Sequence, residues 1–275
     1  MVLEVVMNFR IISESCANIY KYKGIPYTCI YANIDTCASR YEDHRGLDIS
    51  LMMEELDNYC GEVNVSAPNV KDWFSSIKDE DVTFLLPNAS ILSDSYHNAM
   101  LAKNKYISMH PDKQVYVINT NTTGPAMKLI IEKLTQLIHE ELEITEIIDQ
   151  INAYMQNVHV CLLFDKPASF VKSKLFSTKE RVGHILGMYT CSTLKTQKVC
   201  ANKKQALLKL AKTLRKKGFN GTKLIISHTN AKEDAMLLST MLKELFGSIS
   251  IEIIPNSGIN AYAYGKKALL VGFES

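Results

Sequence analysis

The hydrophobic residues of the first half of the chain follow two alternating patterns. Compact apolar runs, typical of buried strands, lie at residues 9–12, 27–34, 82–86 and 114–119. Between these runs, apolar residues recur every three or four positions and predict helices over residues 48–59, 70–77, 94–105, 125–138 and 143–155. Pro125 stands in the first turn of one of them, a position that favours proline. Strands alternating with helices in this way are typical of a parallel sheet covered by helices.

The second half continues the pattern with less regularity. Strands are predicted at residues 159–164, 188–192, 197–200, 223–227, 249–254 and 268–272, and helices near residues 170–176, 204–217 and 231–246. The length of 275 residues allows one large domain or two of ordinary size. We therefore predict two α/β domains, residues 1–156 and residues 157–275, although no glycine- or proline-rich linker marks the boundary.

Composition argues against several classes of protein. A net charge of +2, and lysines at 203–217 without interleaved aromatic residues, predict no nucleic-acid partner and a solvated basic helix face. No apolar run reaches the roughly 18 residues of a transmembrane helix, so no stable membrane insertion is expected. The 7 cysteines and 7 histidines lack metal-ligand spacings, which predicts no metal site and reduced thiols in the cytoplasm. The start of the protein is expected at Met1 or Met7.

Motifs of common enzymes are missing as well. The sequence contains no phosphate-binding Gly-x-x-x-x-Gly-Lys-Ser/Thr loop, no Gly-x-Gly-x-x-Gly after a strand and no Gly-x-Ser-x-Gly elbow. Two pairs of acids, Glu42-Asp43 and Glu54-Glu55, lie in polar surroundings and are expected to be solvated. A catalytic pair of carboxylates is therefore not predicted.

Hydroxyl-bearing segments follow several of the predicted strands. They are Ser13-Glu14-Ser15, Ser66-Ala67-Pro68, Ser90–Ser95 and Thr120–Thr123. Because the carboxyl ends of parallel strands share one edge of a sheet, we expect these segments to meet there. Ser90–Ser95 also precedes a predicted helix, where free backbone N–H groups favour an anion, although on spacing alone Ser93 is better explained as a helix cap. Hydroxyls without an activated base favour binding of an anionic head group over catalysis.

In these segments the chain resembles the DegV family of bacterial fatty-acid-binding proteins. Ser90-Ile-Leu-Ser93-Asp-Ser95-Tyr96 is similar to the family's Ser-x-Leu-Ser-Gly-Ser/Thr-Tyr, and Val65-Ser66-Ala67-Pro68 stands where the family has Thr-Ser-x-Pro. Residues 12–18 resemble its Thr-Asp-Ser-Thr-Ala-Asp segment, and Val117-Ile118-Asn119-Thr120 with Gly124 resembles its Val-Ile-Asp-Ser…Gly segment. The resemblance runs from about Phe9 to Phe273.

The resemblance implies a two-domain α/β fold, an N-terminal parallel-sheet domain and a C-terminal α/β domain, with a lipid pocket between them. It implies a long-chain fatty acid as the ligand, no cofactor and no catalysis by the protein itself, which would present the bound acid to a separate fatty acid kinase. The residues expected to bind the carboxylate are Ser93, Ser66, Tyr262, Ser95, Ser90 and Ser13. The residues expected to line the acyl-chain pocket are Phe164, Phe170, Phe176, Ile185 and Leu186, which fit an ordinary core equally well.

The chain departs from the family pattern at four points. Val65 replaces a threonine and Asp94 a glycine, which alters the hydroxyls and the charge around the head group. Lys174-Leu175 stands near the family's Gly-Arg pair, and residues 259–264 replace its C-terminal histidine segment, so that Tyr262 supplies a hydroxyl there. Two other functions therefore remain open: a phosphotransferase-type enzyme acting on a small hydroxylated substrate, and a family member that has lost lipid binding.

Overall fold

A computed structural model describes residues 7–58, 61–165, 189–192, 197–219 and 221–275. Its N-terminal half is built on a four-stranded sheet in the order β2-β1-β6-β7, with every neighbouring pair parallel. The strands are β1 (Phe9–Glu14), β2 (Tyr27–Ile30), β6 (Val82–Leu86) and β7 (Gln114–Val117). All five residues of β6 are buried, as expected of a parallel strand covered on both faces. The predicted parallel sheet is confirmed.

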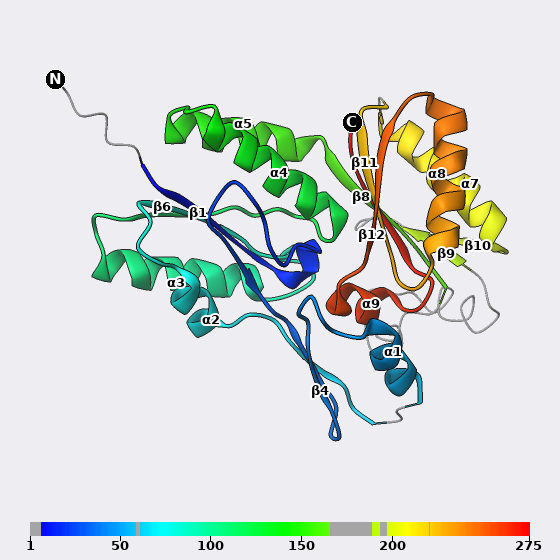
Figure 1. The fold of residues 1–275 in the computed structure, drawn as a ribbon, viewed down its shortest axis with the longest axis horizontal. Helices are drawn as coiled ribbons and strands as arrows, with labels where there is room; N and C mark the ends of the chain where they lie inside the picture. Colours follow the sequence, from blue (N-terminus) through cyan, green and yellow to red (C-terminus); the bar gives the residue numbers. More distant parts are fainter. Residues whose placement is uncertain (1–6, 59–60, 166–188, 193–196, 220) are drawn as a thin grey trace.

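Two pairs of helices cover this sheet (Figure 1). On one face lie α2 (Val70–Ser76) and α3 (Ser95–Met109), whose apolar residues form a core around Trp73 and Leu85. On the other lie α4 (Pro125–His139) and α5 (Ile144–Gln156). Helix α4 starts at Pro125, where the sequence predicted it.

The C-terminal half contains a six-stranded sheet in the order β10-β9-β8-β13-β11-β12. Its strands are β8 (Val158–Phe164), β9 (Tyr189–Ser192), β10 (Gln197–Cys200), β11 (Lys223–His228), β12 (Ser250–Pro255) and β13 (Leu269–Glu274). Strands β11 and β12 pair in parallel, and the other neighbours pair antiparallel. Helices α7 (Lys203–Lys216) and α8 (Lys232–Phe246) pack on one face.

Helix α4 packs against both sheets and so joins the two halves. Its residues Met127 and Ile130 share one core with Phe84 of β6 and with Val160 and Leu270 of the second sheet. The layers therefore run from α2 and α3 through the first sheet, α4 and α5, and the second sheet to α7 and α8 (Figure 1). The domain boundary at residues 156 and 157 stays a prediction.

The N-terminal end of α4 comes very close to strand β13. A Cβ atom on Gly272 would lie 2.5 Å from the backbone nitrogen of Ala126 and 2.6 Å from the carbonyl carbon of Pro125. Real Cβ atoms do not approach backbone atoms so closely, so glycine is required at this position. The contact fixes how the two sheets sit on α4.

A third, small unit lies between the two halves. Its antiparallel sheet has the order β4-β3-β5, from β3 (Asn33–Asp35), β4 (Arg40–Glu42) and β5 (Asn64–Ser66), and it is accompanied by α1 (Ile49–Asn58) and α9 (Gly258–Tyr264). The single strand predicted over residues 27–34 is wrong, because the chain leaves the parallel sheet after Ile30 and continues as β3. Helix α9 was not predicted. It packs through Tyr262 onto Ile34 and Met52.

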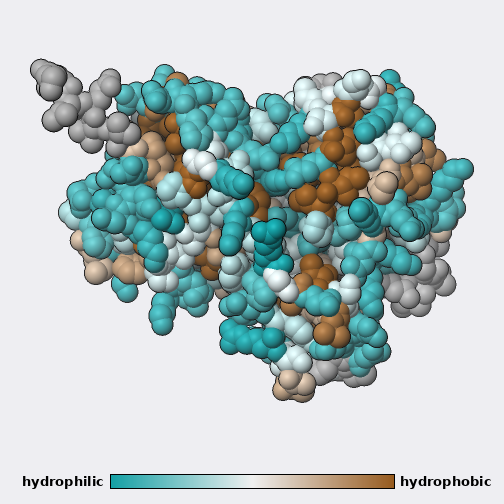
Figure 2. All heavy atoms as spheres, in the orientation of Figure 1, coloured by the Kyte–Doolittle hydropathy of each residue, from teal (hydrophilic) through white to brown (hydrophobic). Residues whose placement is uncertain are grey.

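The space-filling view shows mostly hydrophilic side chains over the left-hand lobe (Figure 2). Hydrophobic ones gather on the right-hand lobe in the region of β12, an edge strand whose Ile251, Ile253 and Ile254 are half-buried. Within the described ranges, no helix is both long enough and apolar enough to cross a bilayer.

Candidate functional site

Three of the predicted hydroxyl segments meet at the carboxyl end of the parallel sheet. They follow β1, β6 and β7, which are neighbours in the sheet. Backbone hydrogen bonds join them: the N–H of Ala89 donates to the carbonyl of Thr122 at 3.2 Å, and the N–H of Gly124 donates to the carbonyl of Cys16 at 3.0 Å. The predicted convergence is therefore confirmed for these three.

Ser66 lies elsewhere than expected. It belongs to β5, where it is paired with Asn33 in the small antiparallel sheet, and it is exposed. The expectation that its segment ends a strand of the parallel sheet is wrong, because this three-residue strand finds its partner in β3. The segment is nevertheless tied to the other loops, since the side-chain amide of Asn98 in α3 donates to the carbonyl of Pro68 at 3.0 Å.

Residues 88–95, here called the head-group loop, connect β6 to α3. Glu14, at the end of β1, accepts a hydrogen bond from the N–H of Asn88 at 2.6 Å and forms another with the hydroxyl of Ser95. The Ser95 hydroxyl also accepts from the indole N–H of Trp73 at 3.1 Å. Both ends of the loop are therefore fixed by buried side chains.

Ser93 lies in the middle of this fixed loop. Its side chain is half-buried, and its hydroxyl oxygen is 3.4 Å from the backbone N–H of Ser95. Ser93 is not the N-cap residue that the sequence suggested: α3 starts at Ser95, and its N-cap residue is Asp94. Asp94 makes no side-chain capping bond and is exposed, as is Ser90.

Two of the predicted carboxylate ligands already have partners within the protein. The hydroxyl of Ser13 lies 2.5 Å from that of Tyr27, and Ser95 bonds Trp73 and Glu14 as described. Both serines are fully buried. We therefore regard Ser93 as the better candidate, while the six assignments stay predictions.

Helix α9 is fastened to the N-terminal half by two side chains that the sequence reading did not assign. The carboxylate of Asp43 accepts hydrogen bonds from the N–H of Gly258 at 2.6 Å, the N–H of Ile259 at 3.1 Å and the hydroxyl of Tyr20 at 2.8 Å. The side-chain oxygen of Asn18 accepts from the N–H of Ser257 at 2.8 Å. These contacts set the position of α9.

The expectation that Asp43 is solvated is wrong. Its exposure is 0%, because the start of α9 covers it and supplies backbone donors. A Cβ on Gly258 would lie 2.9 Å from the Asp43 carboxylate and 2.5 Å from the side chain of Leu47, so glycine permits this close contact. Tyr262, one turn further on, is nearly buried, and burial raises the pKa of its hydroxyl.

Of the residues expected around the acyl chain, the structure describes Phe164. It is buried at the end of β8, in the core that joins the two halves, with its ring 6.1 Å from that of Tyr264. The other four, Phe170, Phe176, Ile185 and Leu186, lie outside the described residues, as does Lys174-Leu175. The acyl-chain pocket therefore stays a prediction.

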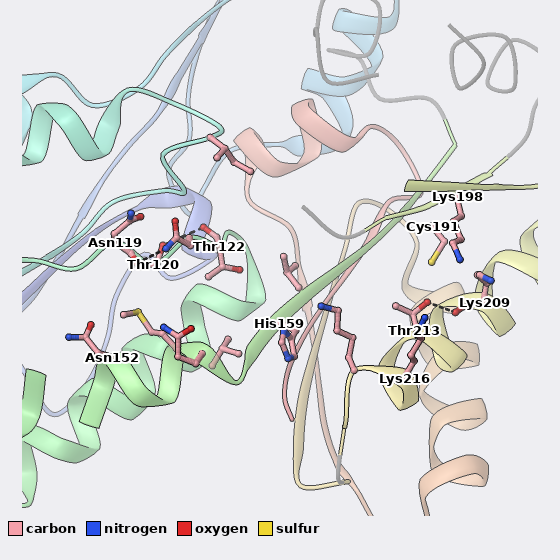
Figure 3. Close-up of a pocket in the computed structure, with 17 residues that line it drawn as sticks. Asn119, Thr120, Thr122, Asn152, His159, Cys191, Lys198, Lys209, Thr213 and Lys216 are labelled. Carbon is pink, nitrogen blue, oxygen red and sulfur yellow. Dashed lines mark hydrogen bonds between the residues drawn. The ribbon is translucent and has the colours of Figure 1, made fainter. Parts of the chain in front are cut away.

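A large groove opens beside the head-group loop, and we call it the basic groove (Figure 3). Its volume is about 1000 Å³. It is lined by Ile91, Asn119–Thr122, Asn152, Met155–Gln156, Val158–Val160, Cys191, Lys198, Lys209, Thr213 and Lys216–Lys217. Figure 3 shows neutral polar residues such as Asn119 and Thr122 on one wall and Lys198, Lys209 and Lys216 on the other.

The charge of the basic groove is not balanced by nearby acids. No aspartate or glutamate lines it, and its four lysines form no salt bridge with any described residue. His159 lies between the walls, and burial, together with the neighbouring Lys217, lowers its pKa. Helix α7 turns Lys209 and Lys216 toward the groove and Lys212 away from it, and Lys212, Lys216 and Lys217 are exposed, in agreement with the predicted solvated helix face.

Metal chemistry finds no support at these sites. Among the described residues, no three histidine, cysteine, aspartate or glutamate side chains are placed to hold a metal ion. Among the described cysteines, Cys16, Cys29, Cys161 and Cys191 form no disulfide, and burial raises the pKa of each of these thiols. A hydrogen-bonding site for an organic anion is what the geometry offers.

Comparison with solved structures identifies the fold. A DegV family protein from Eubacterium eligens, loaded with heptadecanoic acid, is 26% identical and superposes with a TM-score of 0.91, over 97% of this chain and 99% of the other. The fatty acid kinase B3 protein of Streptococcus pneumoniae, loaded with linoleic acid, is 24% identical with a TM-score of 0.92, over 98% and 99% of the two chains. The predicted α/β architecture is confirmed.

Sequence comparison gives the same family. A DegV domain-containing protein of Streptococcus pneumoniae is 25% identical over 284 aligned residues, which cover 98% of this chain and 99% of that protein. The sequence profile of the DegV family, described as a family of uncharacterised proteins, matches residues 8–275. The match covers nearly the whole chain, including both sheets and the three convergent loops, and this protein is therefore a member of the DegV family.

Proposed function

We propose that this protein binds a long-chain fatty acid, does not transform it, and presents its carboxyl group to a fatty acid kinase in the cytoplasm. The observation that carries the proposal is the convergence of the loops after β1, β6 and β7, which holds Ser93 at a fixed position. The 26% identical Eubacterium eligens protein, with the same fold over nearly its whole length, holds heptadecanoic acid.

Ser93 is our first candidate for the ligand's carboxylate. A buried carboxylate needs hydrogen-bond donors, and the half-buried Ser93 hydroxyl stands at the amino end of α3, a helix of 15 residues. Ser66 and Tyr262 are the next candidates, since Asn98 ties the segment of Ser66 to α3 and Asp43 fixes the helix of Tyr262. Ser90, Ser95 and Ser13 complete the proposed set.

The acyl chain would supply most of the affinity. Transfer of each methylene from water to an apolar pocket contributes about 0.8 kcal/mol. Phe164 and the four predicted residues beyond it are the proposed lining, next to the shared core of the two halves. The head group then contributes orientation more than affinity.

Native mass spectrometry tests the binding directly. Freshly purified protein should carry a mass increment equal to one long-chain acid, and delipidated protein should regain it on incubation with oleic acid. Because a hydrogen bond to a charged group contributes about 1.5–3 kcal/mol, Ser93→Ala should weaken binding about 10- to 100-fold. Ser108→Ala, at the exposed far end of α3, is the matched control. Protein that neither carries nor takes up an acid would refute the proposal.

The basic groove is our candidate surface for the kinase. Ile91, a residue of the head-group loop that is 57% exposed, also lines the groove, so a partner seated there would reach the presented carboxyl group. Unbalanced lysines favour an acidic partner surface. Reversing the charge at Lys216 and Lys217 to glutamate should abolish co-purification with the kinase, whereas Lys212→Glu on the outer face of α7 should not. Equal loss in both variants would contradict this placement.

A further inference from the structure

Glu14 is an ionisable side chain within the framework of the head-group loop, and it has no assigned role. It is 3% exposed, at the end of a strand whose last four residues are all buried. It bonds the N–H of Asn88 at one end of the loop and the hydroxyl of Ser95 at the other. A change at its carboxyl group therefore reaches both ends of the segment that carries Ser93.

Among the residues that the structure describes, Glu14 has two hydrogen-bond partners and no counter-ion. Burial, offset in part by Ser95 and Asn88, raises the pKa of Glu14 to about 7. Burial raises the pKa of the thiols of Cys16 and Cys29, and the charge of Glu14 raises both further. No lysine, arginine or histidine among the described residues contributes to its pKa shift.

Two further acids, Asp43 and Asp94, belong to the surroundings of the head-group loop. Asp43 lies beyond the two thiols and raises their pKa, and its own carboxylate is held by α9. Asp94 is the charged residue of the head-group loop itself, and it is exposed to solvent. A ligand carboxylate at Ser93 would therefore add negative charge to a region that already contains acidic side chains. Glu14, which is buried and has no counter-ion among the described residues, is the acid that can most readily take up a proton in return.

We infer that Glu14 is a positioning residue whose carboxyl group takes up a proton when an organic carboxylate binds at the head-group loop. This rests on the proposed function, and deepens it by making fatty-acid affinity depend on pH. The neutral acid still accepts from Asn88 and donates to Ser95, whose hydroxyl can accept, so the loop keeps its framework. The ionised form of Glu14, itself 3% exposed, would repel the ligand's carboxylate, because like charges repel more strongly where one of them is removed from water.

Proton linkage fixes the direction of the effect. When binding raises the pKa of Glu14, affinity is highest where Glu14 is already protonated and falls as the pH rises through about 7. The steepest possible fall is about tenfold per pH unit, and it applies only between the pKa values of the free and the bound protein. A purely structural Glu14 would give no such slope.

Isothermal titration calorimetry with oleic acid tests the inference on the intact protein. At pH 7, in two buffers of different ionisation enthalpy, wild type should take up a measurable fraction of a proton on binding. Its dissociation constant should rise about fivefold or more from pH 6 to pH 8. Glu14→Gln should bind without this proton uptake and with a flatter pH profile. Asp112→Asn, which removes an exposed charge beyond the far end of α3, should keep the wild-type profile.

Each result decides between the possibilities. Wild type that binds oleic acid without proton uptake near pH 7 overturns the inference and leaves the proposed function standing, and so does a Glu14→Gln variant with the wild-type slope. If wild type binds no oleic acid at any pH, the proposed function fails, and the inference fails with it. The proton count on wild type needs no variant, so a Glu14→Gln protein that does not fold still leaves a decisive measurement.

Discussion

Replacement of Asp43 by alanine should loosen the contact between α9 and the N-terminal half. The change removes the acceptor of three hydrogen bonds, from Gly258, Ile259 and Tyr20, at a position with 0% exposure. Each buried donor left unpaired costs about 1–3 kcal/mol, and water entering the vacated space recovers part of this. We therefore expect a loss of about 3–5 kcal/mol in the free energy of unfolding, a large part of a typical total of about 5–15 kcal/mol.

Urea unfolding, followed by the fluorescence of the single tryptophan and by circular dichroism, measures this loss. Trp73 is buried against the parallel sheet and reports on the N-terminal half, whereas circular dichroism reports on the whole chain. Asp43→Asn keeps one acceptor oxygen and should lose about half as much. The adjacent exposed residue supplies the control, Glu42→Ala, expected within about 0.5 kcal/mol of wild type. If Asp43→Ala is as stable as Glu42→Ala, the three hydrogen bonds do not hold α9 as we argue.

Three other perturbations test the same framework. In the ligand-free protein, the pKa of Glu14 of about 7, against an ordinary 4.5, makes folding favour its protonated form. The wild-type free energy of unfolding should therefore fall by about 3 kcal/mol more than that of Glu14→Gln as the pH rises from about 4.5 to 7, and parallel curves in urea titrations would contradict this. Gly272→Ala should destabilise the protein by about 3 kcal/mol or more, since its Cβ would meet the backbone of α4. Gly247→Ala has open space around it and should cost only about 1 kcal/mol, because of the positive φ at that position. Melting temperatures measured by calorimetry distinguish the two variants. Trp73→Phe removes the indole donor to Ser95 and should weaken oleic-acid binding about threefold to tenfold. An unchanged dissociation constant would show that the hydrogen bond to Ser95 does not help to fix the position of Ser93.

The parallel sheet was predictable because its signals are local. Apolar runs of four to eight residues alternate with helical spacing, and Pro125 marks the start of α4 at the residue where the structure has it. The same locality explains the success for three hydroxyl segments: each follows a strand of one sheet, so the topology brings them together. Ser66 broke the rule, because nothing in its short segment distinguishes a strand of the parallel sheet from one that pairs with β3.

The buried acids were missed for two different reasons. The partners of Asp43 in α9 lie 215 and 216 residues further along the chain, so no local sequence pattern predicts them. Glu14 did carry a signal that went unused. Strand β1 lies between two parallel neighbours and is covered on both faces, so a polar residue near its end is buried whichever way it points.

These two acids place different limits on the head-group region. Asp43 meets two backbone donors at the start of α9 and the hydroxyl of Tyr20, so its contacts hold the helix of Tyr262 in one position. Glu14 meets two hydrogen-bond partners and no cation among the described residues, so below pH 7 its neutral form is the more stable one. If the ligand's carboxylate binds at Ser93 as we propose, it would meet Asp43, whose contacts are fixed, and Glu14, which can take up a proton. Protonation of Glu14 would then offset the negative charge that the ligand adds to the region.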